Sequence, residues 1–230
     1  MKLLAVETST EACSAALFIN GDVTERFELA PKEHTQLILP MIDSLMADAG
    51  LKPQQLDALA FSRGPGSFTG VRIATGVIQG IALGADLPVV PVSTLAAIAQ
   101  DFFDHNDDSV AFVAMDARMD EIFWGVYQRD AQGYAELVGD EAVTPADAVE
   151  FPELVGVGIG SGWGVYTQEL TVRLAGYVSR YQADMLPRAG AIARLGARGF
   201  EQGLAVAVEQ AMPVYLRDKV AKTESERRNT

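Results

Sequence analysis

The stretch SRGPGSFTGVR, residues 62–72, places three glycines and a proline between an apolar segment and a helical pattern. Backbone N–H groups between a strand and a helix can bind an anion. The stretch is neither a Walker A sequence nor GxGxxG, it has no P-loop lysine, and Arg72 is its nearest fixed positive charge. Gly64 and Gly66 can equally supply the unusual φ angles of a turn around Pro65. Composition favours the turn and keeps a phosphate cradle as the alternative.

The elements around this stretch predict a first lobe. Three consecutive strands with a turn at 20–22 form an antiparallel meander. Apolar residues at spacings of three and four then predict a helix over 33–49. In chain order, the expected elements are strands 3–8, 12–19 and 23–29, helix 33–49, strand 57–61, helix 68–84, strand 87–92 and helix 94–103.

The second half repeats this order after a polar boundary at 104–109. Its expected elements are strands 110–115, 121–127 and 134–138, a strand at 154–159, and helices at 163–173 and 187–202. The repeat predicts an α/β protein built from two duplicated lobes. We expect an N-terminal lobe over 1–105, a C-terminal lobe over 106–216, and a charged, disordered tail over 217–230.

Composition limits the classes of function. The net charge of −13 makes the chain a poor candidate to bind nucleic acid by itself, because such binding depends on contacts from Lys and Arg to phosphate. Cys13 is the single cysteine, so no intramolecular disulfide forms, and a cytoplasmic location is expected. No apolar run reaches about 18 residues, so we expect no membrane helix.

The helix after the opening stretch has glycine at every fourth position, namely Gly76, Gly80 and Gly84. An interior glycine costs a helix about 1 kcal/mol relative to alanine, so some compensation is expected. Two explanations stay open: tight packing inside the lobe, or a surface that meets another protein.

Residues with catalytic chemistry are few. His34 and His105 have no second histidine at helical spacing, and there is no cysteine pair, so a metal site is not expected. Glu7 to Thr10 can address a phosphate at the end of the first strand or can close a hairpin. Asp116 and Arg118, in MDARMDE, form either a salt-bridged turn or a ligand contact, and the turn is favoured.

Several segments together resemble one family. AVETSTEACSAAL, HTQLILPMIDSLM, FSRGPGSFTGVRIATGVIQGIA, PVVPVSTLAAIA, MDARMDEIFWGVY and PVYLRD occur in the order found in the bacterial TsaB family, also called YeaZ. The resemblance covers about residues 2–218, and GPGSFTGVR is its most specific part.

The resemblance implies the two-lobed, ribonuclease H-like fold of actin, Hsp70 and sugar kinases. It also implies a non-catalytic subunit of the system that forms N6-threonylcarbamoyladenosine at position 37 of tRNAs reading codons that begin with A. The expected partners are the catalytic paralog TsaD and the ATPase TsaE, with a homodimer when the chain is alone and only indirect contact with tRNA.

The same resemblance assigns residues. TsaD would dock on two N-terminal-lobe helices, at Leu37, Met41, Leu45, Ile73, Gly76, Val77, Gly80 and Gly84. Glu7, Ser9, Gly64, Gly66 and Ser67 are weaker candidates for nucleotide contact; Glu7 departs from the family's usual Asp, which puts its role in doubt. Thr94 and Ile98 stand where the catalytic paralogs carry a metal-binding HxxxH pair. No cofactor is required by this chain, and ATP or ADP is expected only at a shared interface.

Two other functions are weighed against this one. A metallopeptidase would need metal ligands that the sequence does not offer. A nucleotide-dependent small-molecule kinase could use an acidic residue after the first strand and glycine-rich turns, but no catalytic aspartate can be singled out.

Overall fold

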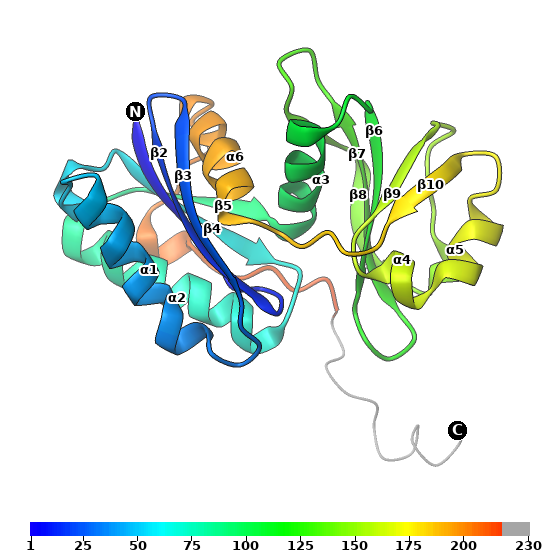
Figure 1. Ribbon diagram of the computed structural model, residues 1–230, viewed down its shortest axis with the longest axis horizontal. Coiled ribbons are helices and arrows are strands. Elements are labelled where there is room, and N and C mark those ends of the chain that lie inside the picture. Colours follow the sequence, from blue (N-terminus) through cyan, green and yellow to red (C-terminus); the bar gives the residue numbers. More distant parts are fainter. Residues whose placement is uncertain (218–230) are drawn as a thin grey trace.

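The computed structural model describes residues 1–217 as two α/β lobes that lie side by side (Figure 1). The chain begins in the first lobe, crosses to the second after α3, and returns to the first at its end. Apart from Arg217, the tail predicted over 217–230 lies outside the described residues.

The first sheet has the strand order β3-β2-β1-β4-β5. Its strands are β1 (Lys2–Glu7), β2 (Ala12–Ile19), β3 (Asp22–Leu29), β4 (Ala58–Gly64) and β5 (Val89–Ser93). β1, β2 and β3 are antiparallel, and the turn between β2 and β3 uses Asn20 and Gly21 at positive φ, as their types predict. β4 and β5 run parallel to β1, and their apolar sequences fit strands that are covered on both faces.

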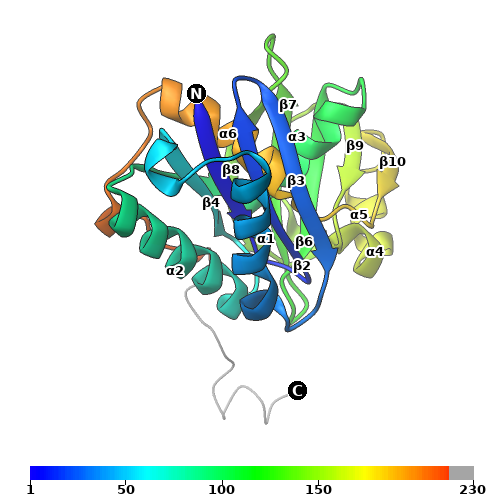
Figure 2. The same ribbon diagram turned by 60° about the vertical axis from the view of Figure 1, so that its left-hand side comes forward.

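Two helices cover the outer face of this sheet, α1 (His34–Asp48) and α2 (Phe68–Ala85), and they lie next to each other (Figure 2). α2 begins at an N-cap, Ser67, and ends at Asp86 in the left-handed conformation. Ile38 and Leu45 of α1 and Ala74 and Ile78 of α2 are buried in one core against Leu4, Leu59 and Phe61.

The second sheet repeats the arrangement, with the order β10-β9-β6-β7-β8. Its strands are β6 (Val110–Asp116), β7 (Ile122–Arg129), β8 (Ala135–Thr144), β9 (Gly156–Ile159) and β10 (Val178–Gln182). α3 (Thr94–His105) packs on one face, while α4 (Gly162–Val165) and α5 (Thr167–Arg173) lie on the other. Three short 3-10 helices, Pro53–Gln55, Ala146–Ala148 and Val208–Gln210, complete the described chain. The matching strand order confirms the predicted α/β class and the duplicated, two-lobed actin/Hsp70/sugar-kinase-like fold.

The predicted lobe boundary is wrong at the C-terminal end. α6 (Ala189–Glu201) packs on the first sheet, where Ala189, Ile192 and Ala193 share a core with Leu3 and Ala60. After α6, Val206 pairs with Val89 and the Val214 amide donates to the Arg63 carbonyl at 2.8 Å. Residues 189–216 therefore belong to the first lobe, and the predicted range 106–216 includes them in error.

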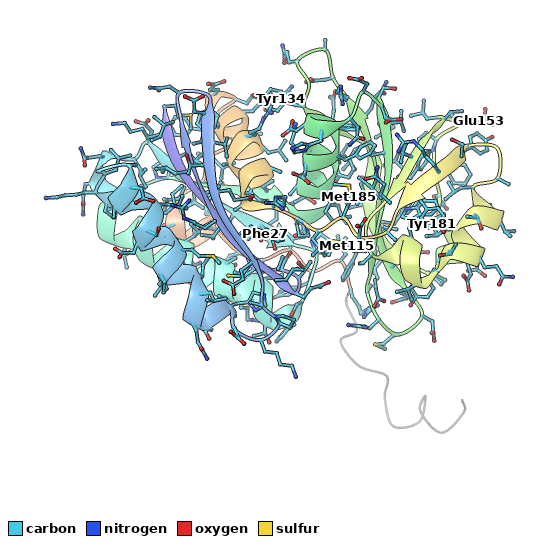
Figure 3. The ribbon with its side chains drawn as sticks, in the orientation of Figure 1. Phe27, Met115, Tyr134, Glu153, Tyr181 and Met185 are labelled. Carbon is cyan, nitrogen blue, oxygen red and sulfur yellow. The ribbon has the colours of Figure 1, made fainter. Side chains whose placement is uncertain are left out.

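Two further differences concern the second lobe. The helix predicted over 163–173 is two short helices that meet at Tyr166. β10 was not predicted, because its sequence, VSRYQ, has little apolar periodicity and its side chains are mostly exposed. The strand is held by pairing with β9 and by Tyr181 (labelled in Figure 3). The ring of Tyr181 stacks on that of Trp163, with 5.7 Å between the two ring centres.

One helix of the described part, α2, is long and apolar enough to cross a membrane on length and composition alone, although the sequence analysis expected none. Its buried residues Val71, Ala74 and Ile78 pack in the core of the first lobe. A core helix of a globular protein meets the same two criteria.

Candidate functional site: the α1–α2 face and the interlobe cleft

The glycines of α2 face open space. A Cβ added at Gly76, Gly80 or Gly84 would meet no atom of residues 1–217 within 4 Å, and all three glycines are exposed. Packing inside the lobe, one of the two explanations left open above, therefore does not account for them. A row of exposed glycines without side chains allows the backbone of another helix to approach closely.

The apolar residues predicted beside these glycines divide into two groups. Leu37, Met41, Ile73 and Val77 are half-buried and pack against the core of the first lobe with part of each side chain exposed. Leu45 is 1 % exposed and belongs to the core, so its assignment as a contact residue is wrong. The apolar spacing placed Leu45 on the apolar stripe of α1. This stripe is wide, and the residues along its centre pack against the sheet.

Two residues of this surface were missed by the sequence analysis. Leu39 of α1 is 55 % exposed and Leu83 of α2 is 76 % exposed. The sequence could have revealed them, because each is an apolar residue on the side of its helix that faces away from the core. We use the name α1–α2 face for the exposed and half-buried apolar residues and glycines of the two helices, namely Leu37, Leu39, Met41, Ile73, Gly76, Val77, Gly80, Leu83 and Gly84.

The opening stretch is fastened to the turn after β1. The Ser67 amide donates to the Ser9 carbonyl at 2.7 Å, and the Thr8 hydroxyl donates to the Gly70 carbonyl at 2.7 Å. A Cβ on Gly66 would lie 2.5 Å from the Ser9 carbonyl oxygen, and one on Gly70 would overlap the carbonyl of Thr8. These glycines are needed because two backbone segments touch, which supports the turn as the role of residues 62–72.

A cleft of about 930 Å³ opens between this loop and the second lobe. Of the residues predicted to contact nucleotide, Ser9, Gly66 and Ser67 line it. Glu7 and Gly64 do not: Glu7 is fully buried, and Gly64, at φ 103°, lies beneath the chain near the Val214 carbonyl. Three of the five predicted residues therefore line one cavity. The prediction that Glu7 and Gly64 also lie there is wrong.

The Glu7 carboxyl is sealed beneath the loop. Its Oε1 accepts a hydrogen bond from the Ser9 hydroxyl at 2.6 Å and another from the Ser9 amide. Glu7 Oε2 and Ser62 Oγ have no hydrogen-bond partner of ordinary geometry among residues 1–217. Burial raises the pKa of the Glu7 carboxyl, and the hydrogen bonds from Ser9 oppose this shift. Burial thus shifts the protonation equilibrium toward the neutral form relative to an exposed glutamate, and the buried carboxyl is not presented to a ligand.

The opposite wall of the cleft is the turn that follows β6. Arg118 pairs with Asp116 at 3.1 Å and its amide donates to the same carboxylate, as the predicted salt-bridged turn requires. Arg118, Met119 and Asp120 all have positive φ. Arg217 donates to the carbonyls of Ala117 and Arg118, so the end of the described chain fastens this turn to the first lobe.

Thr94 and Ile98, the two positions that the resemblance compares with a metal-binding pair, are both buried. Thr94 donates to the Ser9 hydroxyl at 3.3 Å, and Ile98 lies in the core between α3 and the second sheet. Within residues 1–217, no group of three or more acidic, histidine or cysteine side chains is placed to hold a metal ion.

The lobes are joined by polar contacts on both sides of α3. Glu141 of β8 accepts hydrogen bonds from Tyr127 and Ser93 and lies 3.7 Å from Arg63 of β4. At the other end, Arg198 of α6 pairs with Asp130 at 2.5 Å and stacks on Tyr134, whose ring lies between α6 and the second lobe (Figure 3). Sequence reasoning missed both groups, because their members are distant in the chain.

The last described segment, 211–217, runs along α2. Gln79 donates to the Ala211 carbonyl at 2.8 Å. The ring of Tyr215 lies 5.9 Å from that of Phe68, and the Arg72 guanidinium is 3.3 Å from the centre of the Phe68 ring and 5.2 Å from that of Tyr215. We call Phe68, Arg72 and Tyr215 the arginine platform; Phe68 and Tyr215 also line the cleft.

Comparison with known proteins gives consistent relatives. A sequence model of the family "TsaD: tRNA N6-adenosine threonylcarbamoyltransferase" matches residues 27–225. The chain is 44 % identical to the tRNA threonylcarbamoyladenosine biosynthesis protein TsaB of Escherichia coli K12, over 96 % of each chain. It is 39 % identical to the TsaB protein of Haemophilus influenzae, over 96 % of this chain and 95 % of the relative.

A solved structure agrees with these relatives. YeaZ from Pseudomonas aeruginosa superposes with a TM-score of 0.86 at 42 % identity, covering 94 % of this chain and 99 % of that protein. Identity of this level over nearly the whole length, together with the shared two-lobed fold, confirms the resemblance drawn from the sequence. The chain belongs to the TsaB family, also called YeaZ.

Proposed function

We propose that this chain is the non-catalytic subunit that binds and supports TsaD in the formation of N6-threonylcarbamoyladenosine at position 37 of tRNA. The names of its relatives support a role in threonylcarbamoyladenosine biosynthesis. The α1–α2 face supports the partner role, because its three glycines are not required by any close contact among residues 1–217.

The physical argument concerns how closely another helix can approach. Glycines at every fourth position leave a groove along α2, and half-buried Ile73 and Val77 form its wall toward α1. A pair of helices from a partner can pack here at an axial distance of about 8 Å, the lower end of the usual range. Exposed Leu39 and Leu83 gain burial in the same complex, at about 25 cal/mol for each Å² removed from water.

The remaining parts of the proposal come from the family resemblance and from the charge and apolar surface of the chain. TsaE joins the complex through the TsaD-bound form, and the acidic chain meets tRNA only indirectly. Alone, the chain forms a homodimer through the same apolar face. ATP or ADP binds, if a partner supplies further contacts, in the cleft beside Ser9, Gly66 and Ser67. The complex works in the cytoplasm, with its tRNA substrate.

The test is substitution of Gly80 by glutamate. A charged side chain in the groove should abolish TsaD binding in a pull-down and stop tRNA modification in a reconstituted system. The monomer should stay folded, because no atom of the described part of the chain lies within 4 Å of the new Cβ. Val172→Glu is the matched control: Val172 is 72 % exposed on α5 of the other lobe. Survival of binding and modification in Gly80→Glu would place the interface elsewhere.

A further inference from the structure

Arg72 is an exposed guanidinium without a carboxylate partner among the described residues. Of the eleven arginines in residues 1–217, eight lie within 4.0 Å of a carboxylate. Arg129 and Arg173 instead donate to backbone carbonyls at short range. Arg72 makes one long hydrogen bond, 3.3 Å, to the Phe68 carbonyl, so most of its N–H donors face outward.

The two aromatic rings fix the plane of this guanidinium. Phe68 is 52 % exposed and Tyr215 is 47 % exposed, so both rings keep contact with solvent while they hold Arg72. A stacked arginine loses less conformational entropy when it binds a carboxylate, and it can do so through two parallel hydrogen bonds. Exposed Phe, Tyr and Arg together are also typical of residues that dominate protein interfaces.

The arginine platform is continuous with the α1–α2 face. At 100° per residue, Arg72 lies about 40° around α2 from Gly76 and about 80° from Gly80. A helix pair seated on the glycines therefore has Arg72 at its edge, where a charged contact sets orientation and partner choice.

We propose that the arginine platform receives a carboxylate from the subunit that docks on the α1–α2 face. This inference rests on the proposed function and adds the chemistry of the partner. A protein carboxylate is favoured over nucleic-acid phosphate because the chain carries a net charge of −13, which repels an extended polyanion but not a single acidic side chain on a complementary surface.

The test compares the affinity of TsaD from the same organism for the wild-type chain and for Arg72→Ala, by calorimetry at two salt concentrations. Arg72→Ala should weaken binding at least tenfold and should reduce the salt dependence. Arg72→Lys should recover only part of the loss, since an ammonium group neither stacks nor binds two oxygens in a plane. Arg180→Ala is the control, because Arg180 is an exposed arginine on β10 of the other lobe.

A charge exchange identifies the acidic group. Arg72→Glu should lose binding, and substitution of the responsible partner carboxylate by lysine should restore it. Circular dichroism should show that each variant is folded, as the exposed position of Arg72 predicts.

The outcomes separate the two proposals. If the wild-type chain does not bind TsaD, both are overturned. If Gly80→Glu abolishes binding while Arg72→Ala binds as tightly as wild type, the partner role stands and the platform proposal fails. If Arg72→Ala keeps its affinity for TsaD but the complex loses affinity for tRNA, the ligand is phosphate and the platform proposal also fails.

Discussion

Tyr127 of β7 donates its hydroxyl to Oε1 of Glu141 on β8 at 2.5 Å, and this carboxylate also faces Ser93 and Arg63 of the first lobe. Glu141 thus holds one donor from its own sheet and two from the other. Its side chain is only 7 % exposed, so water does not readily replace these partners. A single carboxylate thereby links the two sheets at the base of α3.

Removing this carboxylate should destabilise the protein. Glu141→Ala leaves the Tyr127 hydroxyl and the Arg63 guanidinium without their acceptor, and we expect a loss of about 2–3 kcal/mol in the free energy of unfolding. Tyr127→Phe should cost about 1 kcal/mol. Urea denaturation of both single variants and the double variant measures the coupling.

The control for this series is Glu136→Ala, an exposed acid on the same strand, which should change stability by less than about 0.5 kcal/mol. If the effects of Tyr127→Phe and Glu141→Ala were fully additive, the two side chains would not be energetically coupled and the proposed link would be incorrect.

Replacing two different glycines of α2 by alanine should change the stability of the protein in opposite directions. Gly70→Ala places a Cβ into the Thr8 carbonyl, and because backbone cannot move aside cheaply we expect a loss of about 3 kcal/mol or more. Gly76→Ala meets open space in the same helix and should stabilise the isolated chain by about 0.5–1 kcal/mol. Thermal and urea unfolding of the two variants provide the measurement; equal effects would contradict the assigned roles.

Glu7 should make stability depend on pH. Burial raises its pKa in the folded protein above the ordinary value of 4.5, so the folded state holds this proton more tightly than the unfolded state does. The stabilisation that comes from this tighter proton binding is fully present below pH 4.5. It is lost as the pH rises through the folded-state pKa.

Glu7→Gln should therefore gain stability relative to wild type as the pH is raised from 4.5 to 8, because the amide cannot ionise. The difference between the two urea midpoints at each pH isolates this group from the repulsion of the acidic surface. A difference that stays constant over the range would show that Glu7 titrates alike in the folded and unfolded chains.

Local patterns predicted much of the fold. The apolar spacing predicted α1 within one residue at each end, and Asn20-Gly21 predicted the turn between β2 and β3. The glycine spacing of α2 pointed to a special surface, although only the structure distinguishes open space from tight packing. These features depend on neighbours a few residues apart, which a sequence displays directly.

Long-range contacts could not be predicted in this way. Periodicity shows that α6 has a buried face, but it does not say which sheet covers that face. Tyr215 and Arg72 meet although most of the chain separates them, and the segment 211–217 has no period to reveal its path. Glu7 was expected near a ligand because it lies at the end of the first strand, yet it is fully buried, and the Gly66 loop packs on Ser9 beside it.

The return of α6 to the first sheet has a consequence for synthesis. Leu3, Ala5 and Ala60 emerge early from the ribosome, but the helix that covers them is made only after the second lobe is complete. Until residues 189–201 follow, this apolar surface lacks α6, and only Ala97 of α3 contributes to the same core from an earlier helix. The half of the molecule that is translated first is therefore finished last, and nascent chains that stop before α6 should depend on chaperones.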